Sequence, residues 1–286
     1  MDYVALNNGV KMPMLGYGVY QIEEAECEAC VSEALEVGYR SIDTAQAYLN
    51  ERAVGKAIRK SSVPRSELFL TTKIWVSNAG YEKAKLSIEK SLENLQTDYI
   101  DLVLIHQASN DYYGTYRALE EYYREGKIRA IGVSNFYGDR LVDLAEFSTV
   151  MPAINQIELH PFYQQNDLRE IMKDYQIMPE AWSPLAEGKN NLFTHDVLKA
   201  IGSNYKKTAA QVTLRYLIQL GVIVIPKTIH RERMIENITI FDFHLTEEEM
   251  KQIAQLDTNQ TLFMDHHNPM VVKELTKLGK IETMDK

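Results

Sequence analysis

The chain has 286 residues, of which 45% are hydrophobic and 25% are charged, a composition typical of a globular protein with a large core. Its formal net charge of −9 disfavours a nucleic-acid partner, because phosphate contacts need a basic surface. No segment approaches the roughly 20 apolar residues of a membrane helix, and Met1–Val4 does not begin like a signal peptide. Two cysteines do not make a disulfide framework, so we expect a cytoplasmic protein. We also expect residues 1–286 to form one domain.

The first predicted element is a β-hairpin. Val4–Leu6 and Val10–Met12 flank the turn sequence Asn7-Asn8-Gly9, which favours a tight two-residue connection. Strand-like and helix-like segments then alternate. The predicted strands are Leu15–Val19, Arg40–Asp43, Leu68–Lys73, Asp101–Ile105, Ala130–Val133, Ala153–Ile157, Met178–Trp182 and Val222–Ile225. The predicted helices include Glu24–Val37, Asn50–Lys60, Tyr81–Leu95, Tyr113–Gly126, Gly138–Phe147, Asp167–Tyr175 and Ala209–Leu220.

This alternation predicts an α/β fold. Mostly apolar strands joined by helices indicate a parallel sheet that helices cover, and eight such units in about 250 residues are typical of a (β/α)₈ TIM barrel. The segment Asp257–Lys286 follows the last helical pattern, and we expect it to lie across the C-terminal face of the barrel.

Polar side chains close three neighbouring predicted strands. Asp43, Lys73 and His106 follow strands two, three and four, and Tyr48 comes five positions after Asp43. One such residue is usually a surface group or half of an ion pair. Four of them at neighbouring strand ends predict an active site, because barrel active sites lie at the C-terminal ends of the strands.

These four residue types suit carbonyl reduction. A nearby ammonium lowers the pKa of a tyrosine, so we expect Lys73 to make Tyr48 a usable acid, with Asp43 holding Lys73. His106 can orient a substrate oxygen beside Tyr48. Since no side chain delivers a hydride, the chemistry requires a nicotinamide cofactor.

Motifs around these residues resemble those of the aldo-keto reductase family. They are Gly38–Ala45 with Tyr48–Glu51, Thr72–Trp75, Leu104–His106, Gly132–Phe136, Asn155–Glu158 and Ile225–Lys227. The pair His106-Gln107 and the stretch Asp111–Gly114 are similar to small bacterial members related to 2,5-diketo-D-gluconic acid reductase. The resemblance implies a barrel that reduces aldehydes and ketones with NADPH, with Tyr48 as general acid. It also implies a small-molecule carbonyl substrate and a monomer.

The resemblance also assigns a cofactor site. Gly16 and Gly18 only begin like a Rossmann fingerprint, so we interpret them as backbone positions of the first barrel strand. The expected nicotinamide contacts come from strand ends, and the expected phosphate and adenine contacts come from the loops after strands seven and eight. The full set is Ser134, Asn135, Gln156, Trp182, Ser183, Leu185, Lys227, Thr228, Arg233, Glu236 and Asn237. Within this set, we expect Trp182 to stack on the nicotinamide ring, and we expect Lys227 and Arg233 to face the 2′-phosphate.

The substrate pocket is expected to include Tyr20, Trp75 and Gln107, with Phe263–Pro269 at its border. Gln107 stands where many members have Trp, which favours a polar substrate. An alternative from another functional class is an NADPH-binding barrel that acts as a sensor or scaffold without significant turnover. The four intact catalytic residue types argue against that alternative.

Three other patterns carry less weight. Cys27 and Cys30 form a Cys-x-x-Cys inside a helical pattern, so we interpret both as structural. His266-His267 has no third ligand at a matching spacing, so no metal is expected. No Gly-x-Ser-x-Gly motif surrounds Ser134, which disfavours a hydrolase triad with His106 and Asp43.

Overall fold

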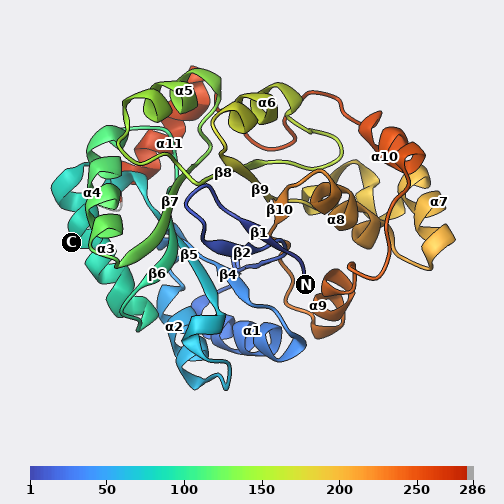
Figure 1. Cartoon of the computed structure of the whole chain (residues 1–286), viewed down its shortest axis with the longest axis horizontal. Helices are drawn as coiled ribbons and strands as arrows, with labels where there is room; N and C mark the ends of the chain where they lie inside the picture. The colour runs from blue at the N-terminus through green and yellow to red at the C-terminus, as the bar shows by residue number, and fades with distance from the viewer. Residues whose placement is uncertain (282–286) are drawn as a thin grey trace.

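The computed structural model describes residues 1–281 and has an eight-stranded parallel sheet at its centre. The strands follow one another in chain order around the sheet (Figure 1). They are β3 (Tyr17–Gly18), β4 (Ser41–Asp43), β5 (Phe69–Ile74), β6 (Ile100–Ile105), β7 (Ile128–Ser134), β8 (Ile154–Glu158), β9 (Met178–Trp182) and β10 (Ile223–Val224). The sheet closes because Leu15 pairs with Val224, and Gly16 N donates to Val224 O over 2.8 Å. The expectation of a (β/α)₈ barrel is thus confirmed.

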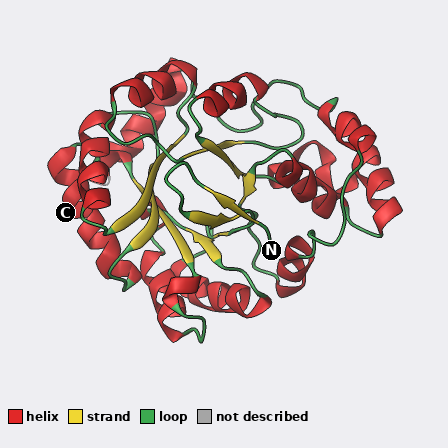
Figure 2. Ribbon diagram, in the orientation of Figure 1, coloured by secondary structure: helices red, strands yellow, loops and turns green. Residues whose placement is uncertain are grey.

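Helices surround the sheet on its outer side (Figure 2). They are α1 (Glu24–Val37), α2 (Glu51–Lys60), α3 (Tyr81–Leu95), α4 (Tyr112–Arg124), α5 (Gly138–Phe147), α6 (Asn166–Asp174), α7 (Asp196–Tyr205), α8 (Ala209–Gln219), α9 (Arg231–Ile238), α10 (Glu247–Ala254) and α11 (Pro269–Ile281). Helix α8 begins at a capping box, in which Thr208 and Gln211 bond to each other's backbone N–H groups. None of the helices in residues 1–281 combines the length and the apolar character of a transmembrane helix.

The N-terminal hairpin consists of β1 (Tyr3–Ala5) and β2 (Lys11–Pro13). Its connection differs from the sequence expectation. Leu6 N donates to Val10 O and Gly9 N donates to Leu6 O, so three residues, not two, form the loop. Gly9 has a φ of +83°, which a residue without Cβ adopts without strain. The extra residue is therefore accommodated as the left-handed position of a three-residue loop.

Two glycines allow the first and last strands to approach closely. A Cβ on Gly16 would lie 3.0 Å from Ile225 Cγ2, and a Cβ on Gly18 would lie 3.0 Å from the Ile225 carbonyl oxygen. Both glycines lie at the first barrel strand, as expected from the sequence, and the structure adds that they allow the barrel to close.

The segment after α10 crosses the C-terminal end of the barrel. Leu262 N donates to Glu158 Oε1 over 2.8 Å, and Thr261 Oγ1 donates to Glu158 Oε2 over 2.5 Å. Glu158 ends β8, so its buried carboxylate ties this segment to the sheet before α11 begins. The prediction for Asp257–Lys286 is confirmed through residue 281, and residues 282–286 lie outside the described part of the chain.

Candidate active site

A buried ion pair lies at the centre of the predicted site. Lys73 Nζ is 2.5 Å from Asp43 Oδ1, and both side chains are almost fully removed from solvent. The ammonium also donates to the Thr44 carbonyl oxygen over 3.0 Å and to the Tyr48 hydroxyl over 3.2 Å. Each hydrogen of the ammonium therefore has an acceptor, and one of these acceptors is the tyrosine.

Tyr48 is held in place by the residues around it. It ends the short 3₁₀ helix η1 (Gln46–Tyr48), and Leu49 follows with a left-handed φ of 58°. The Gln46 side chain accepts from Trp75 N and donates to Ser87 O, which fixes η1 against the end of β5. Asn50 is fully buried and donates to two backbone carbonyl groups before α1. These contacts fix the tyrosine ring beside Lys73.

The pKa of Tyr48 moves in the direction opposite to the sequence expectation. Burial raises it to about 12, and the Lys73 ammonium offsets only part of that increase. The cost of removing a phenolate from water exceeds the attraction of one cation that Asp43 already neutralises. Tyr48 is therefore protonated at neutral pH, which is the form that a proton donor needs.

His106 lies among aromatic rings next to this group. Its ring centroid is 5.7 Å from that of Tyr48 and 5.0 Å from that of Trp75, and both pairs meet edge to face. Tyr20, an exposed ring, lies 5.0 Å from Tyr48. Burial lowers the pKa of His106 well below its ordinary value, and Lys73 lowers it further. A neutral imidazole carries one N–H that can donate to a substrate oxygen.

The side chains expected near a nicotinamide form one hydrogen-bonded group. Asn135 Nδ2 donates to Ser134 Oγ and to the His106 carbonyl oxygen, each over 3.1 Å. Trp182 Nε1 donates to Asn135 Oδ1 over 2.9 Å. Gln156 Nε2 donates to Asp43 Oδ2 over 2.9 Å, which links this group to the ion pair.

The residues expected at the phosphate end lie after β10. Lys227 and Arg233 are both exposed, with Arg233 in the first turn of α9. The Thr228 hydroxyl accepts from His230 N over 3.1 Å, and Asn237 is buried. Glu236 accepts a hydrogen bond from the Thr208 hydroxyl, so in this structure its carboxylate serves the cap region of α8. Ser183 and Leu185 lie partly buried after β9 and before the loop Ala186–Thr194 (η4).

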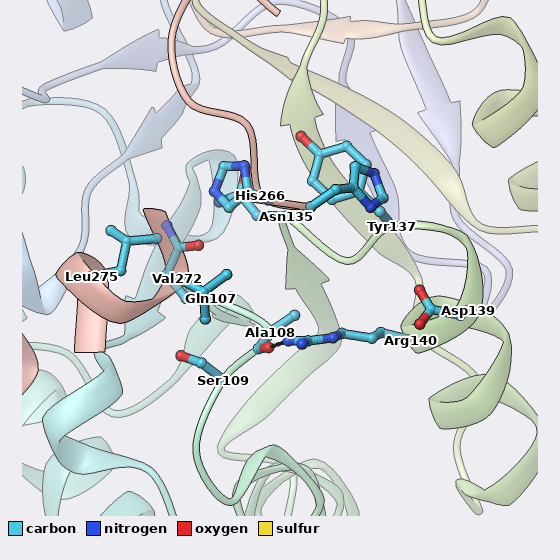
Figure 3. Close-up of a pocket in the computed structure, with 11 residues that line it drawn as sticks. Gln107, Ala108, Ser109, Asn135, Tyr137, Asp139, Arg140, His266, Val272 and Leu275 are labelled. Carbon is cyan, nitrogen blue, oxygen red and sulfur yellow. Dashed lines mark hydrogen bonds between the residues drawn. The ribbon is translucent and has the colours of Figure 1, made fainter. Parts of the chain in front are cut away.

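A small cavity of about 40 Å³ lies between the loop after β6 and the C-terminal segment. In Figure 3, His266 and Asn135 are drawn above Gln107, and the Arg140 side chain is directed to the Ala108 carbonyl oxygen. Both ring nitrogens of His266 are buried, without a partner among the described residues. The cavity thus has polar groups at its wall.

Comparison with known proteins decides the family. The pattern of the aldo/keto reductase family matches residues 12–258 of the chain. The chain belongs to the aldo/keto reductase family. It is therefore an NADPH-dependent oxidoreductase that reduces the carbonyl groups of small molecules, and nothing in the comparisons supports the sensor alternative.

Similar proteins share nearly the whole length of this reductase. The chain is 48% identical to a glyoxal reductase of Bacillus subtilis over 261 residues. This alignment covers 91% of this chain and 94% of the relative. It is 46% identical to a 9,11-endoperoxide prostaglandin H2 reductase of Trypanosoma cruzi (93% and 95% covered) and 42% identical to a methylglyoxal reductase of Escherichia coli (92% and 96%). The crystal structure of a Bombyx mori aldo-keto reductase in complex with NADP superposes with a TM-score of 0.86 at 33% identity (92% and 94%).

The polar groups of the barrel rim suit NADPH. Both hydrogens of the Gln156 amide are donated inward to carboxyl groups, which leaves Oε1 as the atom that can accept from a carboxamide. Lys227 and Arg233 are exposed cations within six positions of each other. The donor and acceptor types therefore match the two ends of this cofactor.

Sequence reasoning missed three residues that shape this site. Gln46 lies between the two stretches of the motif around Tyr48 and Asn50 lies within the second, and the half-buried amide of Gln46 and the buried amide of Asn50 fix η1. Glu180 lies in the middle of β9 with no exposed surface, and its Oε2 accepts from Gln156 Nε2 over 2.9 Å. A carboxylate in the middle of the predicted strand Met178–Trp182 was the available signal, whereas Lys73 was identified as a charge at the end of an apolar run.

The discounted patterns also have places in the structure. Cys27 and Cys30 are free, buried thiols in α1, which fits a structural role. The Ser134 hydroxyl donates to the Gln156 carbonyl oxygen rather than to a histidine. His267 packs beside Tyr137, and no group of three or more His, Cys, Asp or Glu side chains suited to a metal occurs in residues 1–281.

Proposed function

We propose that Tyr48 is the general acid of this reductase and that its preferred substrates are small polar aldehydes, above all 2-oxoaldehydes. The observation that carries the assignment of Tyr48 is the 3.2 Å contact between its hydroxyl and the Lys73 ammonium. Tyr48 is the one protonated acid of the described site whose conjugate base would lie directly beside a cation.

The residues divide the reaction as follows. NADPH, when bound, supplies the hydride to the carbonyl carbon. Tyr48 gives its proton to the carbonyl oxygen, and Lys73 stabilises the phenolate that remains. Asp43 keeps Lys73 charged: burial alone would lower the lysine pKa, but Asp43 and Tyr48 raise it on balance. Neutral His106 donates an N–H to the same oxygen and orients it toward Tyr48.

The remaining cofactor contacts belong to the same proposal. Ser134, Asn135 and Gln156 bind the carboxamide, and Trp182 stacks on the ring. Ser183 and Leu185 contact the pyrophosphate. Five residues contact the adenosine end of the cofactor: Lys227, Thr228, Arg233, Glu236 and Asn237. The exposed Lys227 and Arg233 support selectivity for NADPH, since a 2′-phosphate attracts both cations.

The substrate class rests on the cavity wall and on the relatives. Gln107 and His266 place hydrogen-bonding groups at the cavity, where a second oxygen of a dicarbonyl substrate can bind. Two relatives that cover most of this chain are named for glyoxal and methylglyoxal. Tyr20 and Trp75 do not line that cavity, but their rings lie beside Tyr48 and His106 and would add aromatic surface to a bound substrate.

A substrate panel tests this proposal. NADPH consumption is measured with glyoxal, methylglyoxal, hexanal and benzaldehyde, and we expect kcat/KM to be about tenfold or more higher for the two dicarbonyls. Replacing Gln107 with Trp should reduce that preference, while Tyr113→Phe, which lies outside the described cavity, serves as the control. A wild-type preference for hexanal would contradict the substrate class.

We also propose a cytoplasmic location and a monomeric working unit. The two free, buried thiols suit a reducing compartment. All four proposed catalytic side chains come from one chain, which supports activity without a second copy.

A further inference from the structure

Glu180 is a buried carboxyl group to which the reaction described above gives no role. It lies on β9 in register with Gln156 of β8, so the two side chains point to the same face of the sheet. Its Oε2 accepts from Gln156 Nε2 over 2.9 Å, and its Oε1 is buried without a partner. A side chain this costly to bury calls for a specific purpose.

A continuous chain of contacts joins Glu180 to Tyr48. Gln156 Nε2 contacts both Glu180 Oε2 and Asp43 Oδ2 at 2.9 Å. Asp43 Oδ1 contacts Lys73 Nζ at 2.5 Å, and Lys73 Nζ contacts the Tyr48 hydroxyl at 3.2 Å. Glu180 therefore lies at one end of a hydrogen-bonded series, and the proposed proton donor Tyr48 lies at the other end.

The two carboxyl groups determine which way the Gln156 amide faces. An amide NH₂ group has two hydrogens, and each meets a carboxyl oxygen on the inner side. If the amide turned by 180°, its oxygen would face the Asp43 carboxylate, which has no hydrogen to donate, and the hydrogen bond between Gln156 and Asp43 would be lost. With the NH₂ group directed inward, Oε1 is the atom available to a ligand.

We propose that Glu180 is a positioning residue that holds the Gln156 amide so that its Oε1 accepts from the nicotinamide carboxamide. This inference rests on the proposed role of Gln156 in cofactor binding. Asp43 secures one of the two amide hydrogens and Glu180 secures the second, so removing Glu180 leaves the amide held by one hydrogen bond instead of two.

Burial and charge are compatible with this role. Burial, and secondarily the Asp43 carboxylate, raises the pKa of Glu180 to about 8, so the group is mostly neutral at pH 7. A neutral carboxyl group still accepts a hydrogen bond from Gln156 and adds no second negative charge next to Asp43. Asp43 and Lys73 are the charged groups that act on it.

The test measures NADPH binding by fluorescence titration in Glu180 variants. Glu180→Met keeps the length of the side chain but removes the acceptor, and we expect its Kd for NADPH to rise about tenfold, the loss of roughly one well-placed hydrogen bond. Glu180→Gln keeps an acceptor oxygen and should bind within about twofold of wild type. Combining Glu180→Met with Gln156→Leu should weaken binding no further than Gln156→Leu alone, because the effect passes through Gln156.

Two controls separate positioning from general destabilisation. Glu120→Met removes another buried carboxylate, which lies on α4 and accepts from Thr149 N and Val150 N, and it should leave the Kd unchanged. Should Glu180→Met not fold, Glu180→Val, whose β-branched side chain suits a buried strand, takes its place with the same expected Kd. If wild type binds NADPH but the folded acceptor-free variant binds equally tightly, the inference is overturned. If wild type itself does not bind NADPH, the proposed function fails instead.

Discussion

The Lys73 ammonium and the Asp43 carboxylate form an ion pair at 2.5 Å inside the barrel, with almost no exposed surface on either side chain. Removing one partner of such a pair leaves the other charge buried without compensation. Both partners of the pair are therefore needed for full stability as well as for the proposed chemistry.

Asp43→Asn tests this dependence. Because Lys73 would remain buried beside a neutral amide, we expect the free energy of unfolding in urea to fall by about 3–5 kcal/mol. Glu28→Gln, which breaks the exposed pair between Glu28 and Lys60, is the matched control and should change stability much less. If the two substitutions lowered the free energy of unfolding equally, burial would not make the Lys73–Asp43 pair more important for stability than an exposed pair.

The buried Glu158 carboxylate should control the substrate pocket through the C-terminal segment. Glu158→Gln cannot accept on both oxygens from Leu262 N and the Thr261 hydroxyl, so the segment that carries His266 should loosen. We expect KM for glyoxal to rise about fivefold or more while the Kd for NADPH changes by less than about twofold. A shift in NADPH affinity with an unchanged substrate KM would contradict this view.

Lys227 and Arg233 should account for the preference for NADPH over NADH. Replacing either with Ala removes a cation from the proposed 2′-phosphate site, so the Kd for NADPH should rise about tenfold while the Kd for NADH stays nearly constant. Arg231→Ala is the matched control on the same helix, because Arg231 pairs with Glu36 at 3.1 Å instead. Parallel losses for both cofactors would rule out a contact with the 2′-phosphate.

The raised pKa of Glu180 predicts a pH dependence of stability. The group titrates near 8 in the folded chain and at 4.5 as its ordinary value, so its stabilising contribution is complete below about pH 4.5 and is lost as pH rises through 8. Glu180→Gln does not titrate, so its melting temperature should rise relative to wild type as pH increases from 5 to 9. A constant difference between the two melting temperatures across this range would show that Glu180 is not shifted.

The sequence predicted the barrel and the four residues of its rim because strand runs and their polar ends follow from local patterns. Lys73 was recognisable as a charge that ends an apolar strand. The pKa direction of Tyr48 was not predictable, since burial and the Lys73 charge act in opposite directions and only the structure shows which one prevails. Glu180 was overlooked because its partner, Gln156, is 24 positions away and meets it only through the strand register. Likewise, no local pattern connects Glu158 to Leu262.

The central claim is that Tyr48 gives the proton, and Tyr48→Phe tests it most directly. The substitution removes only the hydroxyl that Lys73 contacts, and Tyr20→Phe, on the exposed ring beside it, is the control. We predict that Tyr48→Phe binds NADPH with the wild-type Kd and reduces glyoxal at least about 100-fold more slowly, because general acid catalysis contributes that much or more. Reduction of glyoxal by Tyr48→Phe at the wild-type rate would contradict the account.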